Sequence, residues 1–240
     1  MQHPSLFTVL TLVILIAALP INSALVGRRL RSSTGSPSSK YFRYVRTIVV
    51  LWSVTALAVY ALRLHGIGAR DVGLVMPHAP WEMALGCLTL IAPLVALLAG
   101  APRGLSPDYA AALRAIVPDG SAQWALFWLV AASAGVCEEF LYRGYLLWVV
   151  SRLTGDLLLG VVASTLAFGF AHAYQGRNGI VGATISGGLY AVVLLVTGSL
   201  YPCMIGHFVQ DLAGAAIVTR RRASVAHDPS AAQRHLPADL

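Results

Sequence analysis

The chain has 240 residues, of which 57% are hydrophobic and only 11% are charged. A soluble domain carries about 25% charged residues, so this composition excludes an ordinary soluble globular protein and indicates a polytopic membrane protein. The net charge is +7. The basic residues lie at the edges of apolar segments and form no nucleic-acid-binding motif, which argues against a nucleic-acid partner.

Seven apolar segments follow one another along the chain, and each is long enough to cross the hydrocarbon core of a bilayer. They cover about residues 6–26, 44–64, 81–100, 123–150, 157–174, 179–198 and 200–218. The fourth is too long for one straight crossing, so it tilts, protrudes or consists of two helices. The predicted fold is an all-α, polytopic transmembrane helical bundle of about seven spans, with six to eight as the range. No basic residue precedes the first segment, which indicates an uncleaved helix rather than a signal peptide.

Basic residues in two clusters set the predicted orientation. They are Arg28, Arg29, Arg31, Lys40, Arg43 and Arg46 around the first connection, and Arg220, Arg221 and Arg222 after the seventh segment. By the positive-inside rule both clusters face the cytoplasm. Seven spans satisfy this rule with the amino terminus outside and the carboxyl terminus in the cytoplasm. The lipid bilayer is therefore the first predicted partner of the chain.

The chain divides into three predicted parts. Residues 1–122 hold amino-terminal transmembrane helices and loops, residues 123–218 form a helical core, and residues 219–240 form a basic cytoplasmic tail that is predicted to be disordered. A short helix that starts at Pro107 and ends before Pro118 is predicted to lie along the membrane interface.

Six ionisable residues lie well inside the predicted spans, where a charge costs at least ~2.5 kcal/mol. They are Glu138, Glu139 and Arg143 in the fourth span, His172 in the fifth, and His207 and Asp211 in the seventh. Residues four apart share a helix face, so Glu139 can pair with Arg143, and His207 with Asp211. Glu138 points about 100° away from Glu139 and has no such local partner.

The number of residues on each side of the turn "LTGD" pairs Glu138 with His172. Glu138 lies 17 residues before Gly155, and His172 lies 17 residues after it. In an antiparallel hairpin both side chains therefore sit about 25 Å from the turn and can face each other. His207 lies only about eight residues after the turn near Ser199. That second turn must dip into the bundle if the three side chains are to meet.

Carboxylates and imidazoles that converge in a low-dielectric site can catalyse hydrolysis. A carboxylate can act as a general base, an imidazole can position the attacking water or hold a metal, and a second imidazole can donate to an oxyanion. Hydrolysis of a peptide bond fits this set best. An ion-coupled membrane transporter is an alternative, because intramembrane Glu, His and Asp also form relays, although we find no inverted repeat. A non-catalytic membrane scaffold is the third interpretation.

Three motifs resemble those of the type II CAAX prenyl endopeptidase and bacteriocin-processing family, also called the CPBP or Abi family. "EEFLYRG" resembles the EExxxR motif, "FGFAH" at Phe168–His172 resembles FxxxH, and "HFVQD" at His207–Asp211 resembles HxxxN or HxxxD. They occur in order within about residues 123–218, whereas the first 120 residues resemble the family only as hydrophobic helices. The resemblance implies an intramembrane endopeptidase of the bacterial plasma membrane. Its partner would be a membrane-anchored protein or peptide substrate, processed in the CAAX or the bacteriocin and self-immunity manner.

The resemblance also implies roles for the motif residues. Glu138 and His172 would activate the water, and His207 and Asp211 would stabilise the oxyanion. Glu139 and Arg143 would support the site by orienting it. Asp211 stands where prenyl-protein members often have Asn, and a carboxylate there could repel an oxyanion or bind a metal.

The requirement for a metal is left open by the sequence. Glu138, His172, His207 and Asp211 are reasonable ligands for a divalent metal such as zinc, although the HExxH spacing is absent. A glutamate-based mechanism and a metal-dependent one therefore both fit the residues. The sequence indicates no other cofactor and sets no oligomeric state.

Overall fold

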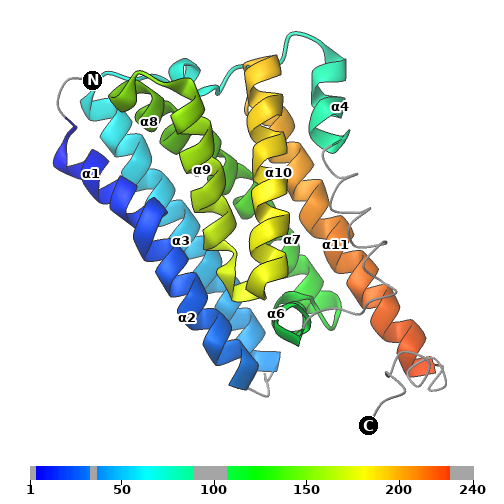
Figure 1. Cartoon of the computed structure of the whole chain (residues 1–240). Coiled ribbons are helices and arrows are strands. Elements are labelled where there is room, and N and C mark those ends of the chain that lie inside the picture. The colour runs from blue at the N-terminus through cyan, green and yellow to red at the C-terminus, as the bar shows by residue number, and fades with distance from the viewer. Residues whose placement is uncertain (1–3, 33–36, 89–106, 228–240) are drawn as a thin grey trace.

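The computed structural model describes residues 4–32, 37–88 and 107–227, and the regular elements within these ranges are helical. The long helices run side by side in one bundle (Figure 1). Within the described ranges, Leu6–Leu30, Lys40–Leu64, Ser121–Thr154 and Ala173–Thr197 are long and apolar enough to cross a membrane. Leu157–Ala171 is a shorter apolar helix. The predicted class, an all-α membrane bundle, is confirmed.

The amino-terminal part is a helical hairpin. α1 (Leu6–Val13), η1 (Ile14–Ala18) and α2 (Leu19–Ser32) follow one another as a single rod, and α3 (Pro37–Leu64) returns beside it (Figure 1). Ser5 caps α1 by accepting a hydrogen bond from the Thr8 amide. The Ser5 amide donates to His65 Nε2 at 3.3 Å, which ties the start of α1 to the end of α3.

Two short helices, η2 (Ala69–Val72) and α4 (Pro80–Leu88), follow the hairpin, and α4 packs against the last helix of the chain. The predicted span 81–100 is described only to Leu88, and its remainder lies outside the described residues. α6 (Pro107–Ile116) is the short helix that the sequence predicts between its two prolines.

The carboxyl end of α6 is capped by side chains of α3. Lys40, Arg43 and Tyr44 donate hydrogen bonds to the carbonyl oxygens of residues 115–117, and Lys40 also pairs with Asp119 at 2.6 Å. The last carbonyl groups of a helix have no partner within the helix, so these contacts satisfy them and fix α6 to the end of the bundle.

The fourth predicted span is one continuous helix. It consists of α7 (Ser121–Glu139), the π-helix η4 (Phe140–Leu146) and α8 (Leu147–Thr154). The residue periodicity did not predict the π-helix, which begins directly after Glu139. Every side chain of η4 is buried. Wider turns of this kind occur frequently at functional sites.

α9 (Leu157–Ala171), η5 (Ala173–Gln175), α10 (Gly176–Thr197) and α11 (Tyr201–His227) complete the bundle. The predicted turn between α8 and α9 is present, and Asp156 caps α9 by accepting from the amides of Leu158 and Leu159. α11 continues to His227, which is eight residues beyond the predicted start of the disordered tail at 219. Residues 228–240 lie outside the described residues.

The turn between α10 and α11 lies inside the protein. Ser199 and Leu200 are almost completely buried. The Leu200 amide donates to Gly73 O at 2.8 Å, and the Ser199 hydroxyl donates to Val75 O at 2.6 Å. The loop after η2 therefore covers this turn, which accounts for its burial.

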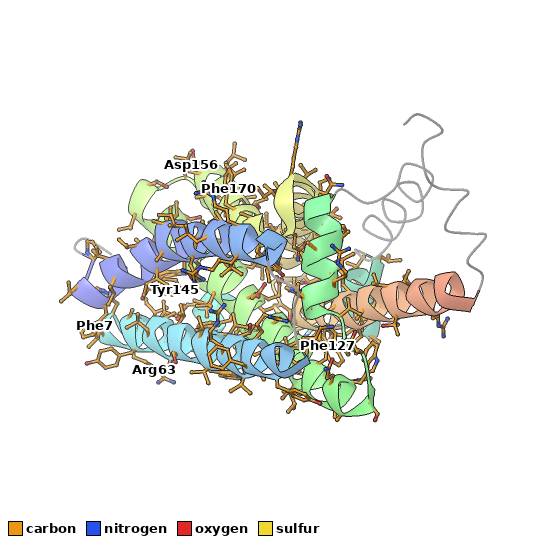
Figure 2. All side chains as sticks on the ribbon, turned by 90° about the horizontal axis from the view of Figure 1, so that it is seen from below. Phe7, Arg63, Phe127, Tyr145, Asp156 and Phe170 are labelled. Atoms are coloured by element: carbon orange, nitrogen blue, oxygen red, sulfur yellow. The ribbon has the colours of Figure 1, made fainter. Side chains whose placement is uncertain are left out.

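The main hydrophobic core surrounds the π-helix. Leu15 from η1, Leu146 from η4 and Phe168 from α9 are among its buried members. Figure 2 shows Tyr145 between the α1–α2 rod and α3, whereas Phe170 lies on the outside with 51% of its surface exposed. α9 thus presents Phe168 inward and Phe170 outward, and its outer apolar face is suited to contact lipid.

Candidate active site

A close approach between α7 and α11 brings the first and third motifs together. A Cβ atom on Gly135 would lie 2.7 Å from Met204 O and 3.2 Å from the Phe208 amide nitrogen. A side chain at this position would push the two helices apart, because real Cβ contacts are not that short. Glycine therefore lets Glu138, one turn further along α7, reach His207 on α11.

Glu138 lies between the two histidines of the site. Its Oε2 atom is 3.9 Å from His172 Nε2 and 4.0 Å from His207 Nε2. These separations are too long for direct hydrogen bonds, and Oε2 is buried without a hydrogen-bond partner in the described part of the chain. One water oxygen at about 2.8 Å from each atom fits such a separation. The predicted juxtaposition of Glu138 and His172 is present in the structure.

His172 ends α9, and its ring is oriented by its own helix. The Nδ1 atom is 2.9 Å from Phe168 O. A carbonyl oxygen only accepts, so Nδ1 carries a proton and donates. In the neutral imidazole the free Nε2 then presents a lone pair toward Glu138. His172 can therefore accept a hydrogen bond from a water molecule that also contacts Glu138.

His207 is held by the second glutamate of the first motif. Its Nδ1 donates to Glu139 Oε1 at 2.8 Å, and the same oxygen accepts from Arg143 Nη1 at 3.2 Å. Glu139 and Arg143 have fully buried side chains. The predicted pair of Glu139 and Arg143 is thus present, and Glu139 Oε1 also joins it to His207 by a hydrogen bond. A carboxylate on Nδ1 supports a positive charge on the imidazole ring, whose Nε2 is then also a donor.

Asp211 is farther from His207 than a hydrogen bond allows. Its Oδ1 lies 3.9 Å from His207 Nε2, so the expected hydrogen bond between these two residues does not form. Glu139 takes the place of Asp211 as the hydrogen-bond partner of His207. Asp211 remains beside the site, with about a third of its side chain exposed.

Two aromatic rings enclose the guanidinium group of Arg143. Its Cζ atom lies 4.1 Å from the centre of the Phe168 ring and 5.7 Å from the centre of the Tyr190 ring. Tyr190 also stacks on His207, with ring centres 5.8 Å apart and planes 15° apart. The sequence analysis missed Tyr190. The residue spacing could have indicated this contact. Tyr190 lies nine residues before Ser199 and His207 lies eight residues after it, so the two are at nearly equal distances from the turn.

The loop after His172 is attached to the amino-terminal helices. The Tyr174 amide donates to Ser23 Oγ of α2 at 2.9 Å, and Gln175 Nε2 donates to the Tyr174 hydroxyl at 2.7 Å. The rings of His172 and Tyr174 are 6.0 Å apart. α2 therefore supports the segment that carries the site histidine, although α2 contains none of the three motifs.

The side-chain positions do not fit a bound metal. The described residues contain no group of three or more His, Cys, Asp or Glu side chains that could hold a metal ion. Ligands of a tetrahedral zinc with bonds of 2.0–2.2 Å lie about 3.4 Å apart. The shortest separations from Glu138 Oε2 to the two histidines are 3.9 and 4.0 Å, and His207 Nε2 lies 3.9 Å from Asp211 Oδ1. These distances fit a glutamate-based mechanism better than a metal-dependent one.

Residues 120–213 match the family model described as Type II CAAX prenyl endopeptidase Rce1-like. This part of the chain is similar to that family. The match contains all three motifs and confirms the resemblance drawn from them. It supports a protease, and with helices able to span a membrane it supports a membrane-bound enzyme that acts on membrane proteins or peptides. No curated protein and no solved structure matches the chain significantly.

Proposed function

We propose that the chain is an intramembrane endopeptidase that hydrolyses a peptide bond in a membrane-associated protein or peptide. The substrate is of the CAAX type or of the bacteriocin and self-immunity type. The observation that carries this proposal is the position of Glu138 Oε2, within 4.0 Å of Nε2 of both His172 and His207, inside the Rce1-like segment. We assign the enzyme to the bacterial plasma membrane, with its amino terminus outside, its carboxyl terminus in the cytoplasm, and residues 123–218 as the catalytic core.

The first step activates a water molecule between Glu138 and His172. Glu138 takes a proton from the water as its oxygen attacks the carbonyl carbon of the scissile bond. His172 Nε2 accepts the second hydrogen of this water and thereby fixes the direction of attack, because Nδ1 is held by Phe168 O. The carbonyl oxygen becomes an oxyanion in the tetrahedral intermediate.

The second step stabilises and then collapses this intermediate. His207 Nε2 donates to the oxyanion, and Asp211 adds a second donor in its protonated form. The Glu139–Arg143 pair holds His207 from its other nitrogen. Glu138 then passes its proton to the nitrogen of the leaving group, the C–N bond breaks, and the carboxylate is regenerated.

The proposal is tested by mapping peptide termini in membranes of cells that carry wild-type protein, Glu138→Gln or Asp156→Asn. Glu138→Gln keeps the size of the side chain and removes the base, so we expect a set of new termini to disappear. Asp156→Asn is the matched control, because Asn caps a helix about as well as Asp and lies in the turn far from the site. Identical maps from stably inserted wild type and Glu138→Gln would contradict the proposal and favour a transporter or a scaffold.

A further inference from the structure

Tyr190 of α10 is completely buried between two members of the site. One is Arg143, whose guanidinium carbon lies 5.7 Å from the ring centre, and the other is His207, whose ring stacks on Tyr190 at 15°. The residues that donate to or accept from reacting atoms in the proposed mechanism do not include Tyr190. Its role must therefore come from what it does to its two neighbours.

A single hydrogen bond does not fix an imidazole ring. The bond from His207 Nδ1 to Glu139 Oε1 restrains one ring atom, and the rings packed beside the imidazole restrain its rotation about the Cβ–Cγ bond. Tyr190 lies nearly parallel to the imidazole, at 15°, and Phe168 meets it edge-on at 87°, each with ring centres 5.8 Å away. The Tyr190 ring therefore restrains the plane of the imidazole from its face. Together the two contacts fix the direction in which Nε2 points, which is toward Glu138 Oε2.

Tyr190 is itself held in place at its hydroxyl group. The hydroxyl donates to Gln210 Oε1 at 3.1 Å, and Gln210 Nε2 lies 3.5 Å from Ser186 Oγ of the same helix α10. Gln210 precedes Asp211 on α11, so this network joins α10 to the helix that carries His207. The phenol ring is therefore fixed both by its stacking partners and by its hydroxyl group.

Gly187 of α10 provides the space that this arrangement needs. A Cβ atom at this position would lie 2.6 Å from Arg143 Nη2 and 3.1 Å from Phe168 Cδ1. An alanine would therefore displace the guanidinium group from between its two rings. The adjacent Gly188 differs, because its Cβ atom would meet only Thr165 Cγ2 at 3.9 Å.

We infer that Tyr190 is a positioning residue of the site, which fixes the plane of the His207 ring while Gly187 gives Arg143 room beside it. The catalytic consequence rests on the proposed peptidase function, whereas the ring geometry does not. Tyr190→Phe keeps the stacked ring and loses the hydroxyl group that donates to Gln210. Tyr190→Leu keeps an apolar side chain but removes the stacked face.

The first test measures hydrolysis of a peptide that spans a cleavage site identified from the Glu138-dependent termini. We expect Tyr190→Leu to lower kcat at least about tenfold with KM unchanged, because the oxyanion donor is misdirected only in the transition state. Tyr190→Phe should stay within about threefold of wild type. Tyr145→Leu is the control for the loss of a buried tyrosine, since Tyr145 is buried between the α1–α2 rod and α3. Equal losses in Tyr145→Leu and Tyr190→Leu would overturn the inference.

The two neighbouring glycines give a second matched pair, which covers the case that Tyr190→Leu does not fold. Gly187→Ala should lower kcat severalfold, because it displaces Arg143 from Glu139 and thereby loosens His207. Gly188→Ala should retain wild-type kcat. Equal activity of the two alanine variants would contradict the role given to Gly187.

The last test needs no activity. Histidine labelled with ¹³C and ¹⁵N is observed by NMR in lipid nanodiscs, and the His207 ring signals are assigned from a His207→Gln sample. A stacked phenol ring shifts these proton signals upfield, so Tyr190→Leu should move them downfield and Tyr190→Phe should not. Unmoved signals in Tyr190→Leu would reject the stacking role. A wild type without Glu138-dependent cleavage would instead reject the proposed function, so the two failures are distinguishable.

Discussion

Lys40 and Arg143 are both buried cations, but their surroundings differ. Lys40, at the junction of α3 and α6, bonds to Val117 O and to Asp119, whose side chain is half exposed. Arg143 bonds through Nη1 to a fully buried carboxylate, and its Nε and Nη2 atoms have no hydrogen-bond partner among the described residues. Oε2 of Glu138 and of Glu139 is likewise buried without such a partner.

The difference separates a structural contact from a reactive one. At the α3–α6 junction Lys40 donates to a carbonyl and to a carboxylate oxygen, so the cation stabilises a helix end at little cost. Around Arg143 several polar atoms are buried without hydrogen bonds from the described part of the chain, an arrangement that costs stability. Such atoms in a native protein call for an explanation such as catalysis. The rings of Phe168 and Tyr190 replace part of the hydration that Arg143 loses.

The largest difference between the two regions is expected in activity. His172→Ala should lower kcat/KM for the mapped peptide at least ~100-fold, because the water loses its second contact beside Glu138. Asp119→Asn, at the α3–α6 junction, should remain within about twofold of wild type. Equal effects of the two variants on purified, folded protein would remove the distinction.

The next difference is expected in stability. Arg143→Met leaves Glu139 as a buried carboxylate without its cation, and we expect a loss of about 3–5 kcal/mol in the free energy of unfolding. Lys40→Met should lose only about 1 kcal/mol, because Asp119 can be hydrated when its partner is removed. Denaturant unfolding in detergent micelles measures both values. A larger loss from Lys40→Met would reverse the comparison.

A smaller effect is expected at Asp211. Asp211→Asn replaces a carboxylate, which repels an oxyanion unless it is protonated, by an amide that always offers a donor. We expect kcat to stay within about threefold of wild type or to rise. Initial rates with the mapped peptide measure the change. An inactive Asp211→Asn variant that folds normally would show that the carboxylate itself is required.

The smallest effect is expected from chelators. Because the site side chains do not fit a tetrahedral metal, incubation with EDTA or 1,10-phenanthroline should change the rate less than about twofold. Strong inhibition that added zinc reverses would show that the side chains rearrange around a metal. It would also restore the metal-dependent alternative left open by the sequence.

Much of this arrangement follows from residue spacing. Composition predicts the helical membrane bundle, and the equal counts around Gly155 place Glu138 opposite His172. The four-residue spacing predicts the contact between Glu139 and Arg143. These predictions are reliable because they depend only on the rise and turn of a regular helix and on one short turn.

The remaining contacts depend on how helices distant in the sequence cross. The four-residue spacing predicts a hydrogen bond between His207 and Asp211. In the structure α7 approaches α11 closely at Gly135, and His207 donates to Glu139 instead. The π-helix after Glu139 leaves no mark in the residue pattern, since all its side chains are buried and nearly all are apolar. The predicted count of about seven spans stays a prediction, because four helices in the described ranges meet the length and composition of a span.

The length of the Ser121–Thr154 helix determines how far a substrate has to reach. Its 34 residues exceed one crossing, since the hydrocarbon core is ~30 Å thick. If the turn at Gly155 marks one membrane surface, Glu138 lies about 25 Å below it and about 5 Å from the opposite surface. An extended chain spans this distance with about two residues. A substrate anchored in that leaflet could thus present its scissile bond to Glu138 without unfolding a transmembrane helix, and cleavage would depend on the length of its anchor-proximal segment.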